Sequence, residues 1–356
     1  METFFKGKKI SSMLGVLPET VSQFDDEVNN YSFPPKQTMR LKKIMGYKQH
    51  RLAKETSTVS DFAVFGLNYM LEHQWISKEE IGAVITVTLC PDHFVPHISN
   101  IVQGSCKLST DIICMDIAQG CCGFLLGLMQ SFLLLEHLGD KKVVLINGDV
   151  LSHKVSKRDR NDFPLIGDAT TLTIVENDAS AREIYFEIHN DGSRGDTLKI
   201  PAGGFRLPST KETAEMTDQG DGNFRSLDNM HMDGSGVFTF VQTEVPPMLA
   251  HAFETAKESI DDIDWFFFHQ PNKFMLQKLA DKAAIPEEKL PMNLVENFGN
   301  PSGASIPMTA IFNCKDELLS SKRHCCLSAF GSGLAWGAMF MDIGKLEHCE
   351  LIESDL

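Results

Sequence analysis

Short apolar runs alternate with longer mixed stretches along the first half of the chain. Residues 81–89 (IGAVITVTL) and 142–147 (KVVLIN) are each typical of a strand buried on both faces. Residues 112–117 and 169–175 predict two further strands, and residues 121–137 predict a helix. Strands that alternate with helices indicate an α/β protein whose mostly parallel sheet is covered on both faces.

The second half of the chain repeats this order of elements. It predicts a strand, a helix, a second strand, a second helix and a closing hairpin, at residues 184–189, 246–259, 265–268, 274–284, and 324–329 with 334–342. We therefore expect two related halves, residues 1–178 and residues 179–356, although they share little sequence identity. The polar stretch 208–233 is expected to be a long surface excursion.

Composition narrows the class of protein. The chain has 356 residues, and 42% of them are hydrophobic, which is enough for a sizeable core. The formal net charge of −15 disfavours nucleic acid and anionic membranes as partners, because both are negatively charged. The most apolar stretch, residues 121–138, is interrupted by Gln130, Ser131, Glu136 and His137, so it predicts a buried helix and no membrane insertion.

The cysteines point to a reducing environment. There are nine, an odd number, and no C-x-x-C motif occurs. This usage is typical of a cytoplasmic protein and argues against a disulfide framework or a metal site. The N-terminus also lacks the apolar region of a secretory signal, which agrees with that compartment.

Cys121 and Cys122 lie where a predicted strand turns into the apolar helix, in the segment MDIAQGCCGF. At a helix N-terminus, unpaired N–H groups and the helix dipole stabilise a thiolate, so this position suits a nucleophile. The alternative is a cysteine that only fills a tight turn with a small apolar side chain. The segment alone does not choose between these interpretations or between the two cysteines.

Two further segments carry polar side chains at the ends of predicted elements. His269 follows the apolar strand in FFFHQPN, where an imidazole can donate a hydrogen bond or a proton into a cleft. Asn300 lies in FGNPSGASIP, a turn that begins a helix, and its amide N–H groups can hold a negatively charged oxygen. Alternatively, His269 is a hydrogen-bonded core residue and Asn300 is a turn former that tolerates left-handed geometry.

Taken together, these segments resemble the ketoacyl-ACP synthase III family of the thiolase superfamily. Residues 116–124 (DIAQGCCGF) are similar to the family's nucleophile motif, and this match selects Cys121 over its neighbour. Residues 269–272 (HQPN) are similar to its H-Q-x-N motif, and residues 299–305 (GNPSGAS) to its G-N-x-S-x-A-S motif. A closing A-F-G-x-G-x-x-W-G pattern stands at residues 329–337, so the resemblance covers nearly the whole chain.

The resemblance implies a thiolase fold and a homodimer. In that fold two related βαβαβαββ-type halves form a five-layered α-β-α-β-α arrangement. Phe94 matches the position from which a partner subunit reaches the acyl pocket, and an ordinary loop aromatic is the alternative. The resemblance implies no bound cofactor. It implies acyl-CoA or acyl-ACP and malonyl-ACP as substrates, and an acyl carrier protein as partner.

The chemistry implied by the resemblance is acyl transfer through an acyl-Cys121 thioester, followed by decarboxylative Claisen condensation with a malonyl thioester. His269 and Asn300 would bind the thioester carbonyl oxygen while the enolate forms. Backbone N–H groups of Cys121, Ser332 and Gly333 are the expected oxyanion hole. Two alternatives remain open: acyl transfer to a hydroxyl or amine, and a non-catalytic subunit that binds a carrier protein.

A carrier protein or a phosphopantetheine arm would need local positive charge on this acidic chain. The resemblance places a phosphate-contacting arginine at Arg160, and Asn272 and Lys273 are further docking candidates. The other basic candidates, for which a solvated surface is the alternative, are Lys48, His50, Arg51, Lys154, Lys157 and Arg158. Ile44 and Phe274 stand where family members carry an arginine, which favours a carrier protein over coenzyme A as acyl donor.

Overall fold

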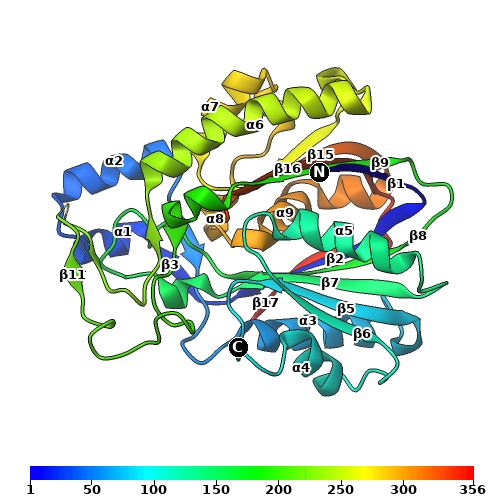
Figure 1. The fold of residues 1–356 in the computed structure, drawn as a ribbon, viewed down its shortest axis with the longest axis horizontal. Helices are drawn as coiled ribbons and strands as arrows, with labels where there is room; N and C mark the ends of the chain where they lie inside the picture. The colour runs from blue at the N-terminus through cyan, green and yellow to red at the C-terminus, as the bar shows by residue number, and fades with distance from the viewer. Residues whose placement is uncertain (221) are drawn as a thin grey trace.

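The computed structural model describes residues 1–220 and 222–356. Two β-sheets lie face to face, with helices between them and on both outer faces, so the layers follow the order α-β-α-β-α (Figure 1). The strand order is β17-β2-β8-β7-β5-β6 in the six-stranded sheet and β1-β9-β16-β15-β14 in the five-stranded sheet. The predicted five-layered arrangement is therefore confirmed.

The six-stranded sheet contains the four strands predicted for the first half of the chain. In spatial order its strands are β17 (His348–Ser354), β2 (Lys8–Pro18), β8 (Ala169–Asn177), β7 (Lys142–Asp149), β5 (Ile81–Thr88) and β6 (Ile113–Ala118). β5 is buried along its whole length, because neighbouring strands and helices cover it on both faces. β6 forms one edge of the sheet.

The five-stranded sheet contains the strands predicted for the second half. They are β1 (Glu2–Phe5), β9 (Ile184–Asn190), β16 (Ala335–Gly344), β15 (Lys322–Gly331) and β14 (Trp265–Phe268). β15 and β16 form the predicted hairpin, whose register runs from Lys322 opposite Gly344 to Gly331 opposite Ala335.

The strand directions differ from the sequence prediction. The pairs β17–β2, β7–β5, β5–β6 and β14–β15 are parallel, whereas the other pairs in the two sheets are antiparallel. β8 returns beside β7 without an intervening α-helix, and β16 follows β15 through a tight turn, and both connections reverse the chain. The expectation of a mostly parallel sheet is therefore wrong, and both sheets are mixed.

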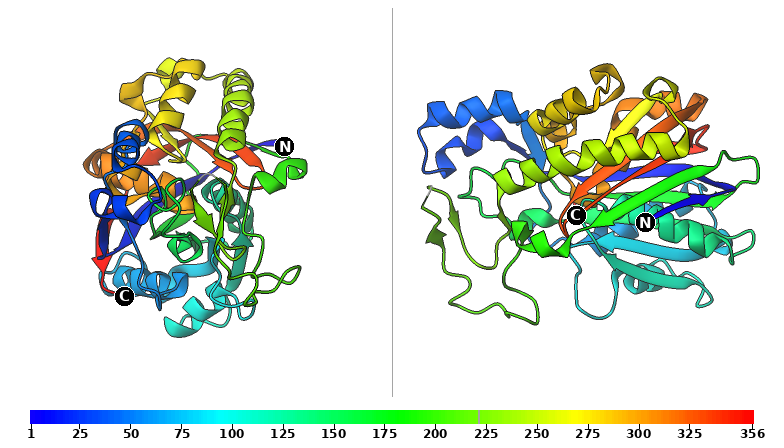
Figure 2. Two further views of the ribbon diagram at one scale, coloured as in Figure 1. Left: turned by 90° about the vertical axis from the view of Figure 1, so that its left-hand side faces the viewer. Right: turned by 45° about the horizontal axis from the view of Figure 1, so that its top comes forward.

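Helices cover the sheets on three levels (Figure 2). α5 (Gly123–Leu135) and α9 (Ser305–Ser320) lie between the sheets, and α5 buries Phe124, Leu128 and Phe132 in the core that both sheets share. The outer layers consist of α3 (Val59–Glu72) with α4 (Ile98–Ser105), and α6 (Gly234–Ala256) with α7 (Lys273–Ala283). α6 begins twelve residues before the predicted helix, because Pro246 and Pro247 lie inside it and not at its start.

Each end of the chain contributes a strand to the sheet of the opposite half. β1 joins the sheet of the C-terminal half by pairing with β9, and β17 joins the sheet of the N-terminal half by pairing with β2. The division of the chain near residue 178 stays a prediction. No helix in the described part of the chain is long and apolar enough to span a membrane.

Smaller elements gather at the end of the molecule that carries α2 (Pro35–Met45) in Figure 1. They include α1 (Phe24–Glu27), α8 (Leu294–Phe298), β3 (Val21–Gln23), β4 (Gln49–Arg51), β10 (Leu198–Lys199), β11 (Thr217–Asp218), β12 (Phe224–Arg225) and β13 (His231–Met232). The excursion predicted over residues 208–233 belongs to this end, and most of its first half is exposed.

Candidate active site

Cys121 lies between the end of β6 and the start of α5, where the sequence predicts it. Its neighbour Cys122 is fully buried at the N-cap of α5, and the Cys122 thiol lies 3.3 Å from the carbonyl oxygen of Ala335. Cys121 is partly accessible and lines a cavity of about 540 Å³. A ligand in that cavity would therefore meet Cys121 and not Cys122.

The turn between β15 and β16 closes directly over Cys121. A Cβ atom on Gly331 would lie 2.4 Å from the Cβ atom of Cys121 and 2.5 Å from its sulfur, so only glycine fits. Hydrogen bonds from the backbone of Ser332 and of Cys121 itself reach the sulfur. Within the described residues, the structure gives no hydrogen bond from Gly333 to the thiol, so two of the three expected oxyanion donors meet at the sulfur.

Burial dominates the acid–base state of Cys121. It raises the pKa of the thiol to about 11, and the nearby Asp149 acts in the same direction. Hydrogen bonds from the backbone and from the Ser302 side chain lower this pKa but do not offset burial. The expectation of a stabilised thiolate at the helix start is therefore wrong for the unliganded protein. The cause is that loss of water outweighs the partial charge at the helix end.

His269 directly follows β14 and is 2% exposed. Its backbone N–H donates to the carbonyl oxygen of Ser328 at 2.8 Å, which continues the β14–β15 ladder. Its Nδ1 lies 2.8 Å from the hydroxyl oxygen of Ser305, the first residue of α9. Burial lowers the pKa of His269 to about 3, so the imidazole is neutral at physiological pH. A neutral imidazole in this position can donate one hydrogen bond to a ligand.

The backbone of Asn300 pairs with residues 165–167. Its backbone N–H donates to Leu165 at 2.7 Å, and its carbonyl oxygen accepts from Gly167 at 3.2 Å. A Cβ atom on Gly167 would lie 1.9 Å from the carbonyl oxygen of Phe298, so this approach requires glycine. The side-chain oxygen of Asn300 accepts from the Ser302 backbone at 2.9 Å, which leaves the amide nitrogen to face a ligand.

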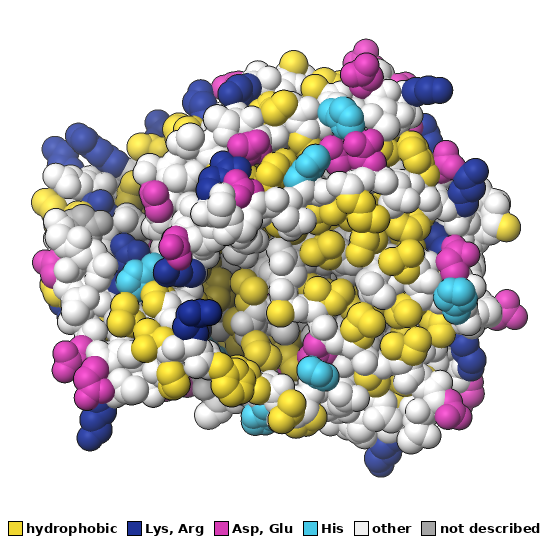
Figure 3. All heavy atoms as spheres, in the orientation of Figure 1, with side chains coloured by type: hydrophobic (Ala, Val, Ile, Leu, Met, Phe, Trp, Pro, Cys, Tyr) yellow, Lys and Arg dark blue, Asp and Glu magenta, His cyan; other side chains and the backbone are white. Residues whose placement is uncertain are grey.

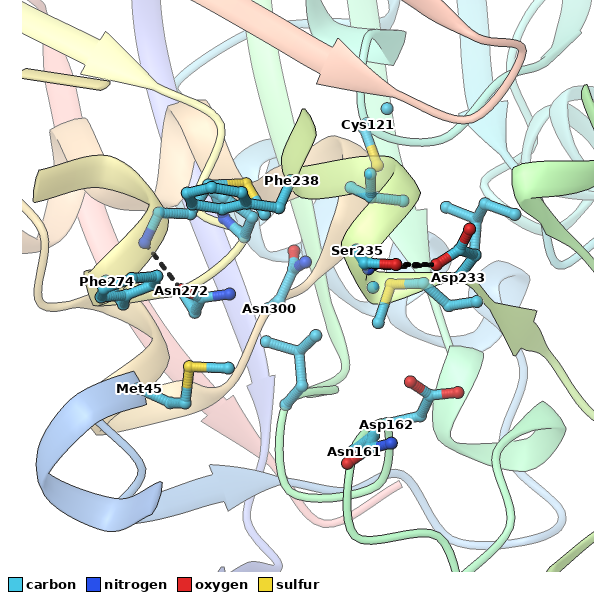
Figure 4. Close-up of a pocket in the computed structure, with 18 of the residues that line it drawn as sticks. Met45, Cys121, Asn161, Asp162, Asp233, Ser235, Phe238, Asn272, Phe274 and Asn300 are labelled. Atoms are coloured by element: carbon cyan, nitrogen blue, oxygen red, sulfur yellow. Dashed lines mark hydrogen bonds between the residues drawn. The ribbon is translucent and has the colours of Figure 1, made fainter. Parts of the chain in front are cut away.

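Cys121, His269 and Asn300 come from three separate segments and line the same cavity. Figure 4 shows Cys121 and Asn300 extending into it, with Asn272, Phe238 and Phe274 along its wall. A second, mainly apolar cavity of about 270 Å³ also reaches Cys121 and Asn300. Its aliphatic lining comes from Leu89, Leu151, Leu165, Ile166, Leu198, Ile200, Met230 and Met232. The thiol of Cys121 therefore lies where a larger cavity meets a smaller one, and apolar side chains form most of the lining of both.

Only some of the other predicted site residues line the larger cavity. Arg160 and Asn272 line the larger cavity, and Asn272 also caps α7 by accepting from the Met275 backbone at 2.9 Å. Lys273 packs beside Gly46 at the end of α2. Phe94 is 60% exposed and lines neither cavity in this chain.

Two basic docking candidates are not available for docking. His50 is 1% exposed, lies 2.6 Å from Glu27 through its Nε2 and also hydrogen-bonds to the Ile166 backbone. Arg51 is 9% exposed and donates to Pro18 and Glu353. Their hydrogen-bonding groups are used inside the protein, so the prediction that these two residues dock a substrate is wrong.

Sequence reasoning missed polar residues that support the site. Asp149, at the end of β7, accepts from the Leu89 backbone at 2.7 Å and from Thr88 at 2.9 Å, and burial raises its pKa to about 6. Ser302 and Ser305 contact the predicted trio. The available signal was their position in the sequence, since Asp149 follows the predicted strand at residues 142–147 and Ser302 and Ser305 lie in the segment 299–305 that carries Asn300.

One cluster outside the cavity combines potential metal ligands. Ligand atoms of Glu2, Glu187 and His251 lie within 4.8 Å of one another. The carboxylate of Glu187 is already engaged by the Tyr185 hydroxyl at 2.8 Å and by His189 at 2.5 Å. We therefore interpret this cluster as a hydrogen-bonded network at the sheet surface.

Comparison with known proteins gives a consistent family. Profiles of 3-oxoacyl-[acyl-carrier-protein] synthase III and of its C-terminal part match residues 115–192 and 253–343. A Campylobacter jejuni protein assigned as a 3-oxoacyl-[acyl-carrier-protein] synthase 3 is 30% identical over 348 residues, 97% of each chain. The beta-ketoacyl-[acyl-carrier-protein] synthase III of Natranaerobius thermophilus is 31% identical over 298 residues, which cover 82% of this chain and 87% of the relative.

A solved structure extends the agreement to the whole fold. The 3-oxoacyl-(acyl-carrier protein) synthase of Burkholderia xenovorans superposes with a TM-score of 0.91 at 28% identity, over 99% of both chains. The sequence relatives and this structural neighbour agree with the resemblance found in the motifs and with the predicted thiolase fold. The chain therefore belongs to the 3-oxoacyl-[acyl-carrier-protein] synthase III family of acyl-transferring enzymes.

Proposed function

We propose that this protein makes a 3-oxoacyl thioester by decarboxylative Claisen condensation, with Cys121 as nucleophile and His269 and Asn300 as hydrogen-bond donors to the enolate. One observation carries the proposal. The thiol, the neutral imidazole and the oriented amide come from three segments of the chain and face one cavity. Family membership supports the same chemistry.

In the first half-reaction, the sulfur of Cys121 attacks the carbonyl carbon of an acyl thioester. The negatively charged oxygen of the tetrahedral intermediate is stabilised by the backbone N–H groups of Cys121 and Ser332. The carbon–sulfur bond to the donor then breaks, and the thiol proton of Cys121 ends on the released thiol. The acyl chain stays on Cys121 and extends into the apolar cavity of about 270 Å³.

In the second half-reaction, a malonyl thioester occupies the larger cavity with its carbonyl oxygen between His269 and Asn300. The bond to the malonyl carboxylate breaks, carbon dioxide leaves, and the electron pair forms an enolate that both side chains stabilise. The enolate carbon attacks acyl-Cys121, which yields the 3-oxoacyl thioester and returns the Cys121 thiolate, later reprotonated from solvent. The order is ping-pong, because the first product leaves before the malonyl thioester binds.

The low pKa of His269 argues against transfer of the acyl group to a hydroxyl or amine. Such a transfer needs a base that removes a proton from the acceptor, and an imidazole with a pKa of about 3 is a weak base. The same imidazole remains neutral and can donate a hydrogen bond to an enolate. A non-catalytic subunit would have no need of the thiol, the imidazole and the amide in one cavity.

We also propose a homodimer in which Phe94 of one subunit approaches the acyl pocket of the other. The edge strand β6 is partly exposed, and Phe94 and Val95, in the segment between β5 and α4, are 60% and 77% exposed. Edge strands and exposed apolar side chains are commonly covered by a second subunit. Light scattering would measure the dimer, and Phe94→Ala should broaden the range of accepted acyl chains.

The remaining proposals concern substrates and compartment. We propose acyl-CoA or acyl-ACP as donor, malonyl-ACP as extender, and no bound cofactor. The names of the relatives include an acyl carrier protein, which supports a carrier protein as partner. We infer a cytoplasmic location, since all nine cysteines are free thiols.

Two measurements on the intact protein test the reaction. Mass spectrometry after incubation with an acyl donor should show one acyl adduct, which Cys121→Ala removes and the matched control Cys122→Ala retains. Carbon dioxide release from a malonyl thioester should then accompany loss of the adduct. An adduct that passes to a hydroxyl or amine without carbon dioxide release would contradict the proposal.

A further inference from the structure

The outward side of α2 concentrates positive charge in an acidic chain. α2 carries Lys36, Arg40, Lys42 and Lys43 and no acidic residue, whereas the whole chain has a net charge of −15. Lys42 pairs with Asp25 at 2.7 Å. The other three cations are exposed and form no ion pair within the described residues. Figure 3 shows Lys and Arg side chains gathered at the upper left, where Figure 1 places α2.

Apolar side chains belong to the same side of the helix. At 3.6 residues per turn, Met39 and Ile44 flank the row formed by Lys36, Arg40 and Lys43. Met39 is 40% exposed and Ile44 is 49% exposed. We call these five residues the α2 basic face. Cations around exposed apolar side chains suit a surface that binds an acidic protein, because charge guides the encounter and apolar contact holds it.

The inward side of α2 forms part of the wall of the active site. Leu41 and Met45 line the cavity of about 540 Å³ that reaches Cys121. The exposed lining residues Asn161 and Asp233 mark the opening of this cavity, and Figure 4 shows them across from Met45. A protein bound to the α2 basic face would therefore lie beside this opening.

Other parts of the rim offer less positive charge. The rings of Phe238 and Phe274 stack with centroids 5.6 Å apart and make that side aromatic. The guanidinium of Arg160 lies over the ring of Phe33, 3.3 Å from its centroid. The exposed cations Lys36, Arg40 and Lys43 form no ion pair within the described residues, and they belong to the helix whose other side lines the cavity.

We infer that the α2 basic face is the docking surface for an acidic carrier protein. Its phosphopantetheine arm would enter the cavity past Met45 and bring a thioester to Cys121. The inference rests on the proposed condensation for the identity of the cargo. Attraction between the exposed cations and a negatively charged carrier raises the association rate and weakens as salt screens it.

A charge reversal separates docking from chemistry. Arg40→Glu/Lys43→Glu should raise the KM for malonyl carrier protein about tenfold or more and remove most of its salt dependence. The kcat/KM for malonyl-pantetheine, which has no protein part, serves as the reference and should change less than twofold. The matched control Lys107→Glu/Lys315→Glu makes the same change of charge at two exposed positions outside the α2 basic face and should leave both substrates unaffected.

Direct binding keeps this test independent of the reaction. Titration of the enzyme with fluorescently labelled acyl carrier protein in its holo form should give a Kd that rises about tenfold in the α2 variant only. Equal Kd values for the two variants would overturn the docking surface. So would an equal loss of activity on both thioesters, because α2 would then only support the cavity. If carrier protein binds but neither thioester releases carbon dioxide, the proposed condensation fails and the docking surface stands.

Discussion

Cys121 and His269 line the same cavity, but burial shifts their pKa values in opposite directions. It raises the pKa of the thiol to about 11 and lowers the pKa of the imidazole to about 3, so both groups are neutral at physiological pH. Around the sulfur, the backbone of Ser332 and of Cys121 supplies donors that can stabilise an anion. Around the imidazole, Ser305 supplies a neutral partner. The donors around Cys121 can stabilise negative charge that appears during the reaction, whereas the surroundings of His269 keep the imidazole uncharged.

The strongest test of this contrast removes the donors to the enolate. His269→Ala and Asn300→Ala should each lower the rate of carbon dioxide release about 10²–10³-fold, because each loses one donor to the developing oxyanion. Acylation of Cys121 should fall much less, since its oxyanion is held by backbone groups. Single-turnover measurements of the two half-reactions check this. If either variant slows acylation as much as decarboxylation, His269 and Asn300 do not act specifically on the enolate.

The pH dependence of the two half-reactions should differ as well. Below the pKa of about 11, the thiolate fraction of Cys121 rises tenfold per pH unit, so acylation should speed up about 100-fold between pH 6 and pH 8. Decarboxylation by preformed acyl-enzyme should be flat over that range, because His269 titrates only near pH 3. Stopped-flow acylation and carbon dioxide release report the two profiles. A plateau of acylation near pH 7 would show that the resting thiol is far more acidic.

A smaller change would disturb the sulfur and leave the imidazole in place. Gly331→Ala would set a methyl group within van der Waals distance of the Cys121 sulfur, and relief of that overlap must move one of the two segments. We expect about tenfold slower acylation and a loss of about 1–3 kcal/mol in the free energy of unfolding. Gly204→Ala is the matched control, because a Cβ atom there meets nothing within 4 Å. Unchanged acylation in Gly331→Ala would mean that the turn does not hold the thiol.

The parts of the site that could be predicted are those whose signals come from residues close together in the sequence. Cys121, His269 and Asn300 each follow or precede a short apolar run, and runs such as β5 and β14 are recognisable because they are buried on both faces. β2 was missed because Lys8, Lys9, Ser11 and Ser12 interrupt its apolar pattern. The structure buries Ser11 and Ser12 between β8 and β17, and both of those strands are distant in sequence.

What could not be predicted depends on partners far away in the chain. His50 and Arg51 look like surface cations, but His50 is buried against Glu27, and Arg51 is buried and donates to the exposed Glu353. The acidity of Cys121 was misjudged for the same reason. The helix start is visible in the sequence, whereas the turn at Gly331 that shuts out water lies more than two hundred residues away.

The smallest expected effect concerns the partner of the imidazole. Ser305→Ala removes the hydroxyl that lies 2.8 Å from Nδ1 of His269 and that contributes, together with a hydrogen bond of the Ser302 backbone, to the orientation and tautomer of the ring. Loss of one neutral hydrogen bond is worth about 1 kcal/mol, which predicts about fivefold slower decarboxylation and little change in acylation. Ser305→Thr, which keeps a hydroxyl, should restore most of the rate. Nitrogen-15 NMR of His269 would report the tautomer directly. A rate loss in Ser305→Ala with an unchanged tautomer population would assign Ser305 to packing at the start of α9 and not to positioning of the imidazole.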